Sequence, residues 1–480
     1  MHDAMTRLAS TYHTNTPELS AVKEQLRLLA FAESPVPSPD ILDRVQQTLT
    51  MRERLATLLE GELNFHGEDS GYASHDLHAF AAKFPPQLPR AFIRGLTKSG
   101  DVVLDPMMGS GTTVVEALLE ERRGVGLDID PLALRLGRVK TMPLDAHSLR
   151  DEGYKVISQA STLLSKGTTI DLELTHRFDE RTKAFLDYWF LPTTQRELMA
   201  LVLAIANVTT TSARRFLELT FSSTIVTKSG GVSRARDLAH SRPHLDETKV
   251  PKNALEQFAI RLRKNLTSIM QLKTNGTMTA ALAGDARFMP FSDGVIDLIV
   301  TSPPYANAID YMRAHKFSLV WLGESVVDLS ALRARYLGSE RIEHTHYAAL
   351  PARPETTIRE LAERDNSRAG ILRKYFVEME SVLSEMYRVL RNNSAAIVVV
   401  GTSVMRGIDV QTHYGLADIA ARLGFDVVGV VQRILDRNKR MMPARFGKKT
   451  DSMIEQRMHE EYVIGLLKPG RSPEGPHAES

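Results

Sequence analysis

The stretch from residue 100 to 140 constrains the fold of this chain more than any other part of the sequence. A short apolar run ending in aspartate, Val102–Asp105, precedes a glycine-rich turn and the apolar-rich segment 114–119. A second run, 124–128, leads into a helix that begins near Pro131. This pattern is typical of a βαβ unit of about 30 residues. Repeated units of this kind build a parallel sheet with helices on both faces.

Further apolar runs predict five more strands, and two amphipathic segments predict helices between them. The strand candidates are residues 278–282, 295–300, 395–400, 426–431 and 462–467, and the helix candidates are residues 376–390 and 415–423. No helical pattern separates the last two strands, which favours an antiparallel pair at one edge of the sheet. We therefore predict an α/β fold with a doubly wound, mostly parallel seven-stranded sheet and an antiparallel edge strand.

The glycine-rich turn, residues 105–113, reads Asp-Pro-Met-Met-Gly-Ser-Gly-Thr-Thr. Its glycines let the backbone approach a ligand closely, and the helix that follows offers free N–H groups. A phosphate-binding P-loop is disfavoured because no lysine follows the second glycine. A dinucleotide site is disfavoured because Val114 stands where a third glycine would help packing. Asp128, at the end of the second strand, is a candidate to accept ribose hydroxyls.

A second motif, Ser302-Pro303-Pro304-Tyr305, directly follows the predicted strand 295–300. Open α/β sheets place their chemistry at the carboxyl ends of the strands. The prolines stiffen the backbone and carry no N–H groups, so the nearby carbonyls are free to accept hydrogen bonds. Ser302 adds an acceptor, and Tyr305 offers a flat face to a planar ring.

Together these motifs resemble those of the S-adenosylmethionine-dependent amino-methyltransferases of nucleic acids. The family signature pairs D-P-x-x-G-S-G-T-T with [DNS]-P-P-[YFW], and the chain has both, at residues 105–113 and 302–305. The segment 75–86 is similar to the one that these enzymes place before the first strand. The resemblance covers about residues 75–135 and 276–467, and it implies the Rossmann-like class I methyltransferase fold.

The resemblance also implies S-adenosylmethionine as the cofactor and assigns residues to it. Gly109 and Gly111 would face the cofactor, and Asp105 would hold its amino-acid portion. Asp128 would hold the ribose, with Asp130 as a competitor for that role. Asp285 would accept from the adenine amino group, and residues 84–85 would contact the methionine end. The implied cofactor-binding residues are Phe84, Pro85, Asp105, Pro106, Gly109, Ser110, Gly111, Thr112, Asp128 and Asp285.

The implied catalytic residues are Ser302, Pro303, Pro304 and Tyr305. An exocyclic base amine is a poor nucleophile because its lone pair is delocalised into the ring. Acceptors at Ser302 and the Pro303 carbonyl would localise that lone pair, and Tyr305 would stack on a base flipped out of the duplex. The chain has no cysteine, which argues against cytosine C5 methylation through a thiolate. In the family, Ser at the first position is linked mainly to cytosine N4 and Asp or Asn mainly to adenine N6, so cytosine N4 is favoured.

Five parts are predicted along the chain. They are an N-terminal helical extension (1–70), the cofactor-binding half of the methyltransferase domain (71–145), a mainly helical inserted target-recognition region (146–275), the catalytic half (276–468) and a disordered tail (469–480).

The net charge of +2 on 480 residues identifies no partner by itself, so any surface that binds nucleic acid must be local. Two basic stretches, 228–242 and 437–449, are suited to phosphate or base-edge contacts. The predicted nucleic-acid-binding residues are Arg234, Arg236 and Arg242 in the first stretch and Lys439 and Arg440 in the second.

We therefore expect a site-specific methyltransferase that acts on double-stranded DNA in a restriction-modification or other DNA-marking system. Whether a cognate restriction endonuclease accompanies it, and its oligomeric state, are left open. The alternatives are adenine N6 as the target, an RNA substrate, or a catalytically silent DNA-binding subunit. No apolar run approaches the ~20 residues of a membrane span, and no signal-peptide pattern begins the chain, so a cytoplasmic protein is expected. No metal is expected, because no carboxylate cluster accompanies the histidine pairs 75/78 and 344/346.

Overall fold

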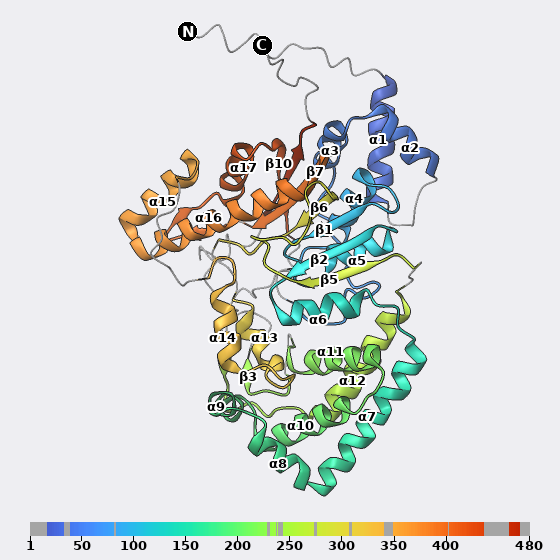
Figure 1. The fold of residues 1–480 in the computed structure, drawn as a ribbon, viewed down its shortest axis with the longest axis vertical. Helices are drawn as coiled ribbons and strands as arrows, with labels where there is room; N and C mark the ends of the chain where they lie inside the picture. Colours follow the sequence, from blue (N-terminus) through green and yellow to red (C-terminus); the bar gives the residue numbers. More distant parts are fainter. Residues whose placement is uncertain are drawn as a thin grey trace, which may run out of the picture.

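A computed structural model gives the arrangement of the chain (Figure 1). It describes residues 17–32, 39–80, 83–227, 231–236, 238, 243–272, 276–306, 310–339, 349–401, 403–435 and 460–470. Within these ranges, no helix is long and apolar enough to cross a lipid bilayer.

Seven strands form one twisted sheet with the order β10-β11-β7-β6-β1-β2-β5. The strands are β1 (Val102–Asp105), β2 (Arg123–Asp128), β5 (Thr279–Ala283), β6 (Ile296–Thr301), β7 (Leu390–Gly401), β10 (Asp426–Ile434) and β11 (Glu460–Lys468). All neighbours run parallel except β11, which is antiparallel to both β7 and β10. The predicted sheet and its antiparallel edge pair are confirmed, with the detail that the reversed strand, β11, lies one place in from the edge.

The strand order reverses between β1 and β6, which are neighbours in the sheet although a long stretch of chain separates them. From β1 the chain builds outward through β2 to β5, and from β6 it builds in the other direction to β7. A crevice therefore opens at the carboxyl ends of β1 and β6, where α/β sheets of this kind bind their ligands.

Strand side chains alternate between the two faces, and each face has its own apolar cluster. Val103 and Leu298 pack with the N-terminal helices, whereas Leu104 and Ile299 pack with the helices that follow β6. The first face is covered by α3 (Met51–Leu59), α4 (Gln87–Leu96), α5 (Thr112–Leu119) and α6 (Pro131–Lys140), and α1 (Pro17–Phe31) and α2 (Pro39–Thr48) pack outside them. The second face is covered by α16 (Asn366–Val389) and α17 (Thr412–Arg422), with α15 (Ala352–Arg364) alongside.

The N-terminal helices belong to the core of the sheet domain. Leu55 and Leu59 of α3 are buried, and both lie directly over the strand glycine Gly465 of β11. A methyl group added to Gly465 would fall 2.6 Å from Leu59 Cδ1, so the absence of a side chain there lets α3 pack closely. Sequence patterning indicated these helices but not their place against β10 and β11.

A separate helical body lies beyond α6 (Figure 1). It contains α7 (Ala146–Lys166), α8 (Thr168–His176), α9 (Glu180–Trp189), α10 (Pro192–Ala206), α11 (Thr211–Ile225) and α12 (Ala254–Met270), with the short hairpin β3 (Ala235–Arg236) and β4 (His244–Leu245). Two helices that follow β6, α13 (Met312–Leu319) and α14 (Val326–Ala334), also pack into it. The hairpin β8 (Val404–Met405) and β9 (Ile408–Asp409) completes the described elements.

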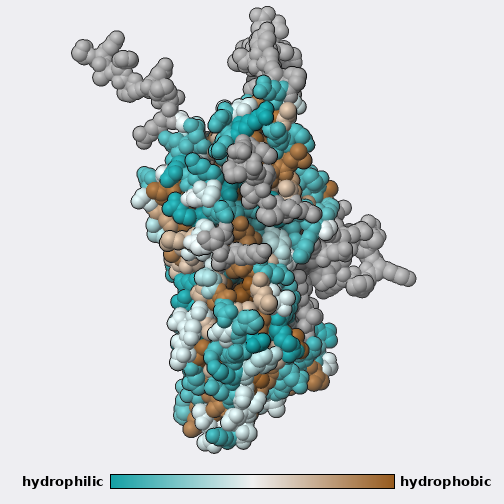
Figure 2. Space-filling model, turned by 90° about the vertical axis from the view of Figure 1, so that its right-hand side faces the viewer, coloured by the Kyte–Doolittle hydropathy of each residue, from teal (hydrophilic) through white to brown (hydrophobic). Residues whose placement is uncertain are grey.

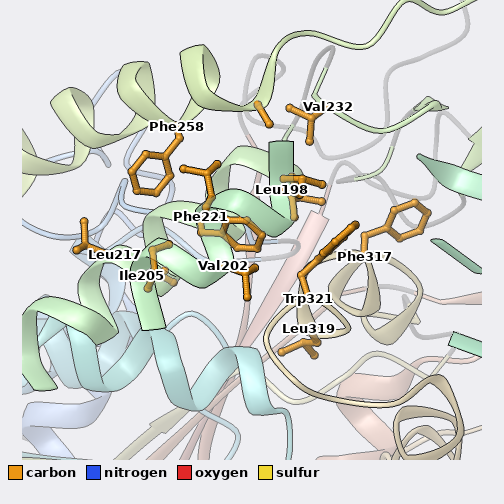
Figure 3. Packing of buried hydrophobic residues seen from close by; sticks show 14 of the residues in the cluster. Leu198, Val202, Ile205, Leu217, Phe221, Val232, Phe258, Phe317, Leu319 and Trp321 are labelled. Carbon is orange, nitrogen blue, oxygen red and sulfur yellow. The ribbon is translucent and has the colours of Figure 1, made fainter. Parts of the chain in front are cut away.

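The core of the helical body is rich in leucine and aromatic side chains (Figure 3). Phe221 of α11 and Phe258 of α12 both lie in this core, while Phe317 and Trp321 enter from α13 and the turn after it. Leu132 and Leu136 of α6 join the same cluster. Helix α6 therefore touches the sheet on one side and the helical body on the other.

Seen from the side, the surface is mixed, with polar residues over most of both ends and apolar side chains gathered near the middle (Figure 2). Among large apolar residues, Met278 and Phe288, which flank the edge strand β5, are strongly exposed, at 78% and 77%.

Candidate active site

A pocket opens at the carboxyl ends of β1, β2 and β6. The empty space within it, open solvent at its mouth included, is about 890 Å³. The glycine turn and the Ser-Pro-Pro motif both contribute to its wall. The predicted site residues that line it are Phe84, Asp105, Pro106, Gly109, Ser110, Thr112, Asp128, Asp285, Ser302 and Pro304.

The glycine turn closes one side of the pocket because its backbone is left-handed at two positions. Gly109 has φ +48° and Gly111 has φ +78°, and Gly111 is the N-cap of α5. A methyl group on Gly109 would lie 3.2 Å from the Phe80 ring, so glycine keeps this approach open. The amide of Gly109 donates to Asp128 Oδ2 at 2.7 Å, which fixes the turn against the end of β2.

Asp128 and Asp130 compete in the sequence for a ribose, but the structure gives them different neighbours. Asp130 caps α6 by accepting from the Leu132 amide, and its other oxygen accepts from His315 Nδ1 at 2.6 Å and from the Tyr336 hydroxyl at 2.8 Å. Within the described part of the chain, Asp128 accepts only from the amides of Gly109 and Asp130. Asp128 therefore retains more capacity to accept from a ligand.

Burial raises the pKa of Asp128 to about 7, and the negative charge of Asp130 acts in the same direction. For Asp130, burial is opposed by the hydrogen bonds and positive charge of His315, which leave the pKa below its ordinary value. The two carboxyls thus titrate far apart although they are two residues apart.

Asp105 stands at the end of β1 and is almost fully buried. Its Oδ1 accepts from Thr301 Oγ1 at 2.7 Å and from the Met107 amide at 3.2 Å. The bond to Thr301 joins β1 to the last residue of β6, directly before Ser302. Burial raises the pKa of Asp105 to about 6.

Asp285, after β5, forms a bidentate ion pair with Arg287, at 2.9 and 2.6 Å. Burial alone would raise its pKa, but the hydrogen bonds and charge of Arg287 outweigh burial and lower it. Arg287 also bonds Glu378 Oε1 at 2.7 Å. The carboxylate predicted to meet an adenine amine is therefore ionised and held in place by an arginine.

The Ser302–Tyr305 motif divides into two parts. Ser302 and Pro304 line the pocket, whereas Pro303 is buried. The Tyr305 ring packs against Gly401 of β7, and its hydroxyl donates to Glu461 Oε1 at 2.7 Å. Tyr305 is thus beside the motif's pocket-lining residues and is fixed from the far side by β7 and β11.

Other predicted residues lie away from the pocket wall. Pro85 and Gly111 are adjacent to lining residues but are not among them. In the helical body, the Arg236 Nε donates to Asp246 Oδ2 at 2.6 Å, and the backbone amide of Arg234 donates to the Trp189 carbonyl. Arg242, Lys439 and Arg440 lie outside the described residues, as does the tail from residue 471 onward.

An aromatic wall was missed by the sequence reasoning. Phe80 and Tyr311 line the pocket with ring centroids 5.7 Å apart and nearly parallel planes, and His315 packs against Phe80 at 5.0 Å. Tyr336, after α14, lines it as well. Phe80 lies within the segment recognised before the first strand, and Tyr311 follows Ser302–Tyr305 closely, so their positions gave a signal. Nothing in the sequence around Tyr336 indicates its role.

Comparison with known proteins bears on the chemistry of this pocket. A family model described as DNA methylase matches residues 58–138, which include β1, the glycine turn and β2. The chain is 24% identical over 386 residues to the Type II methyltransferase M.MvaI of Kocuria varians, covering 74% of this chain and 83% of the relative. It is 31% identical over 155 residues to the Type II methyltransferase M.AvaI of Nostoc sp., covering 28% of this chain and 32% of that relative.

Among solved structures, one match is a putative DNA modification methylase from Thermus thermophilus complexed with S-adenosyl-L-methionine. It has 18% sequence identity and a TM-score of 0.21, and the match covers 40% of this chain and 55% of that chain. The fold assignment rests on the strand order and directions described above.

Proposed function

We propose that this chain, a DNA amino-methyltransferase of the N4-cytosine and N6-adenine type by its sequence, methylates cytosine N4 in double-stranded DNA. The observation that carries the proposal is that one pocket is lined both by the glycine turn after β1 and by Ser302 and Pro304 after β6. A methyl donor and an amine acceptor can therefore meet at a single switch point of the sheet.

The cofactor is S-adenosylmethionine, and the side chains that line the pocket can be compared with the chemical groups of that molecule. The ligand carries a positively charged sulfur, an amino-acid end and an adenosine, so it requires carboxylates and flat apolar surfaces. Asp105, Asp128 and Asp285 supply carboxylates, and Phe80 and Tyr311 supply flat surfaces. The residues fit the group. When bound, it would supply a methyl group carried on a positively charged sulfonium. The sulfur is the leaving group and becomes a neutral thioether when the methyl group is transferred.

The chain's own contribution is to hold the target amine and remove its delocalisation. Ser302 Oγ and the Pro303 carbonyl are proposed to accept the two amine hydrogens, which turns the nitrogen lone pair toward the methyl group. The methylated amine then releases one proton to solvent. Positioning and electrostatics supply the catalysis, and no covalent enzyme intermediate forms.

A base inside a duplex cannot reach this pocket, so the proposed substrate nucleotide is flipped out of the stack. Tyr305, next to Ser302 and Pro304, is proposed to stack on the flipped base. Cytosine N4 is favoured over adenine N6 because serine occupies the first position of the motif.

The helical body lies beside the pocket, and we assign target recognition to it. Phosphate or base contacts are proposed for Arg234, Arg236, Arg242, Lys439 and Arg440. Arg236 is exposed, and its partner Asp246 lies at the same hairpin, so DNA would compete with that ion pair. We also propose a role in a restriction-modification system, with a cognate endonuclease as a partner; its support is that relatives such as M.MvaI and M.AvaI are named Type II methyltransferases.

The test is nucleoside mass spectrometry on unmethylated DNA and on RNA, each incubated with purified protein and labelled S-adenosylmethionine. We expect N4-methylcytosine in DNA, and its loss in Ser302→Ala and Tyr305→Ala variants that still bind the cofactor. Label on adenine would reject the base assignment, and label in RNA would reject the substrate. Absence of label from both would favour a catalytically silent DNA-binding subunit.

A further inference from the structure

We propose that Glu461 and Arg433 are positioning residues for Tyr305, and that through them the N-terminal segment 63–66 takes part in building the pocket for the flipped base. The inference rests on the proposed function of Tyr305 as a stacking residue. Neither side chain belongs to either of the motifs identified in the sequence.

Tyr305 is held at both its ring and its hydroxyl. A methyl group added to Gly401, the last residue of β7, would fall 2.5 Å from Tyr305 Cε2, so the ring occupies the space that a side chain would fill. The hydroxyl donates to Glu461 Oε1 at 2.7 Å. Glu461 pairs with Gly401 in the β7–β11 ladder, so both constraints come from one cross-strand pair.

Glu461 is itself fixed by a buried arginine. Arg433 of β10 is only 2% exposed, and its Nη1 donates to Glu461 Oε2 at 2.6 Å. One carboxylate oxygen therefore serves Tyr305 and the other serves Arg433. Removing either partner of a buried ion pair leaves an uncompensated charge, so the pair enforces the geometry of the tyrosine.

The remaining hydrogen bonds of Arg433 reach the N-terminal part of the chain. Its Nε donates to the Leu63 carbonyl at 3.0 Å and its Nη2 to the Asn64 carbonyl at 3.4 Å. Asn64 Oδ1 also accepts from the amide of Ile434 at 2.6 Å. The chain Tyr305–Glu461–Arg433–Leu63 thus links the proposed base pocket to the segment after α3.

This arrangement has a direct consequence for the reaction. An aromatic ring contributes stacking only at one orientation, and Tyr305 freed at its hydroxyl could rotate away from that orientation. A misplacement of about 1 Å in a catalytic constellation costs on the order of 10²-fold in rate. The carboxylates proposed to hold the cofactor, Asp105 and Asp128 at the ends of β1 and β2 and Asp285 after β5, do not depend on this link.

The experiment measures single-turnover methyl transfer to unmethylated double-stranded genomic DNA and, separately, the Kd of labelled S-adenosylmethionine by equilibrium dialysis. We expect Glu461→Ala, Tyr305→Phe and Gly401→Ala each to slow transfer, by on the order of 10²-fold for the first, while the cofactor Kd stays within about twofold. Glu461→Gln should recover only part of the rate, because its amide oxygen can still accept from Tyr305 whereas its NH2 group cannot accept from Arg433.

One substitution serves as a matched control. Glu460→Ala changes the neighbouring glutamate of β11, which pairs with Ile434 and not with Gly401. This variant should retain the wild-type rate. Wild-type rates in Glu461→Ala and Gly401→Ala would overturn the inference, as would a parallel loss of cofactor binding, which indicates general unfolding. A wild-type protein that transfers no methyl group to DNA would instead overturn the proposed function, and the inference with it.

Discussion

At the scale of single residues, the site is distinguished by carboxyl groups whose environments separate their titration. Asp128 and Asp130 are both buried, yet the pKa of Asp128 is raised to about 7 and that of Asp130 is lowered. Asp130 accepts hydrogen bonds from His315 and Tyr336 that Asp128 lacks, and the charge of Asp130 raises the pKa of Asp128 further. Such separation is frequent at functional sites.

The raised pKa of Asp128 predicts a pH dependence of stability. An unfolded aspartate has a pKa of about 3.9, so the folded protein binds this proton more tightly. The stability due to Asp128 is fully present below about pH 4 and is lost as pH rises through about 7. Asp128→Asn should remove this loss. Between pH 4 and pH 8, its free energy of unfolding should therefore fall by less than that of the wild type, by at most about 4 kcal/mol. Urea unfolding at both pH values measures the free-energy difference.

The same substitution tests the cofactor role. Ionised Asp128 accepts hydroxyl hydrogens better than the neutral acid, so wild-type affinity for S-adenosylmethionine should strengthen as pH rises through about 7. Loss of a charged hydrogen-bond acceptor is worth ~1.5–3 kcal/mol, so Asp128→Asn should weaken binding by roughly 10- to 100-fold and remove the pH dependence. The exposed Asp151→Asn serves as the control, and equal effects in both variants would contradict the assignment.

Part of the residue-level site could be predicted from the sequence, and the reason for the limit is physical. The glycine turn and Asp128 sit in a local pattern, because strand, turn and helix are consecutive. The pairing of Asp285 with Arg287 is also local, but an ion pair leaves no mark on the hydrophobic pattern of the sequence and so could not be predicted from it. Tyr336 reaches Asp130 across 206 positions of sequence, and only the folded chain brings them together.

At the scale of elements, the short apolar runs were sufficient to predict every strand of the main sheet. Strand ends follow from local turns, and the antiparallel pair follows from the missing helical pattern between β10 and β11. The place of α1 to α3 was not predictable, because an amphipathic helix does not specify which surface covers its apolar face. The same holds for α13 and α14, which pack with the helical body although they follow β6.

The position of α3 leads to a prediction. Leu55 is fully buried between α3 and the sheet, so Leu55→Ala should lower the free energy of unfolding by ~2–5 kcal/mol. Leu28→Ala, at a position 65% exposed, should have little effect. Chemical denaturation of both variants provides the comparison. Similar stabilities would show that α3 is not part of the sheet core.

At the scale of the whole molecule, the pocket and the helical body share elements. Helix α6 carries Asp130 at its N-terminus and Leu132 and Leu136 in the core of the helical body. Helix α13 follows Tyr311 of the pocket wall and carries Phe317 into the same core. Occupation of the pocket should therefore be communicated to the helical body through two helices.

The two tryptophans of the chain make this testable, since both lie in the helical body. The ring centroids of Trp189 and Phe317 are 4.9 Å apart, and those of Trp321 and Phe190 are 5.6 Å apart. S-Adenosylmethionine at about 100 times its Kd should stabilise the folded state by roughly 2.7 kcal/mol, and the melting transition seen by tryptophan fluorescence should rise accordingly. A rise in the melting temperature measured by far-UV circular dichroism, without a rise in the one measured by tryptophan fluorescence, would show that the sheet domain and the helical body unfold separately.

The hydrogen bond between Asp105 and Thr301 joins residues 196 positions apart. During synthesis, β1 and β2 therefore emerge long before β6, and the edge of β1 that pairs with β6 stays unpaired until β6 is made. At about 5–20 residues per second this interval lasts ~10–40 s. Helices α7 to α12 of the helical body are made within that interval, whereas α13 and α14, which complete its core, are made only after β6.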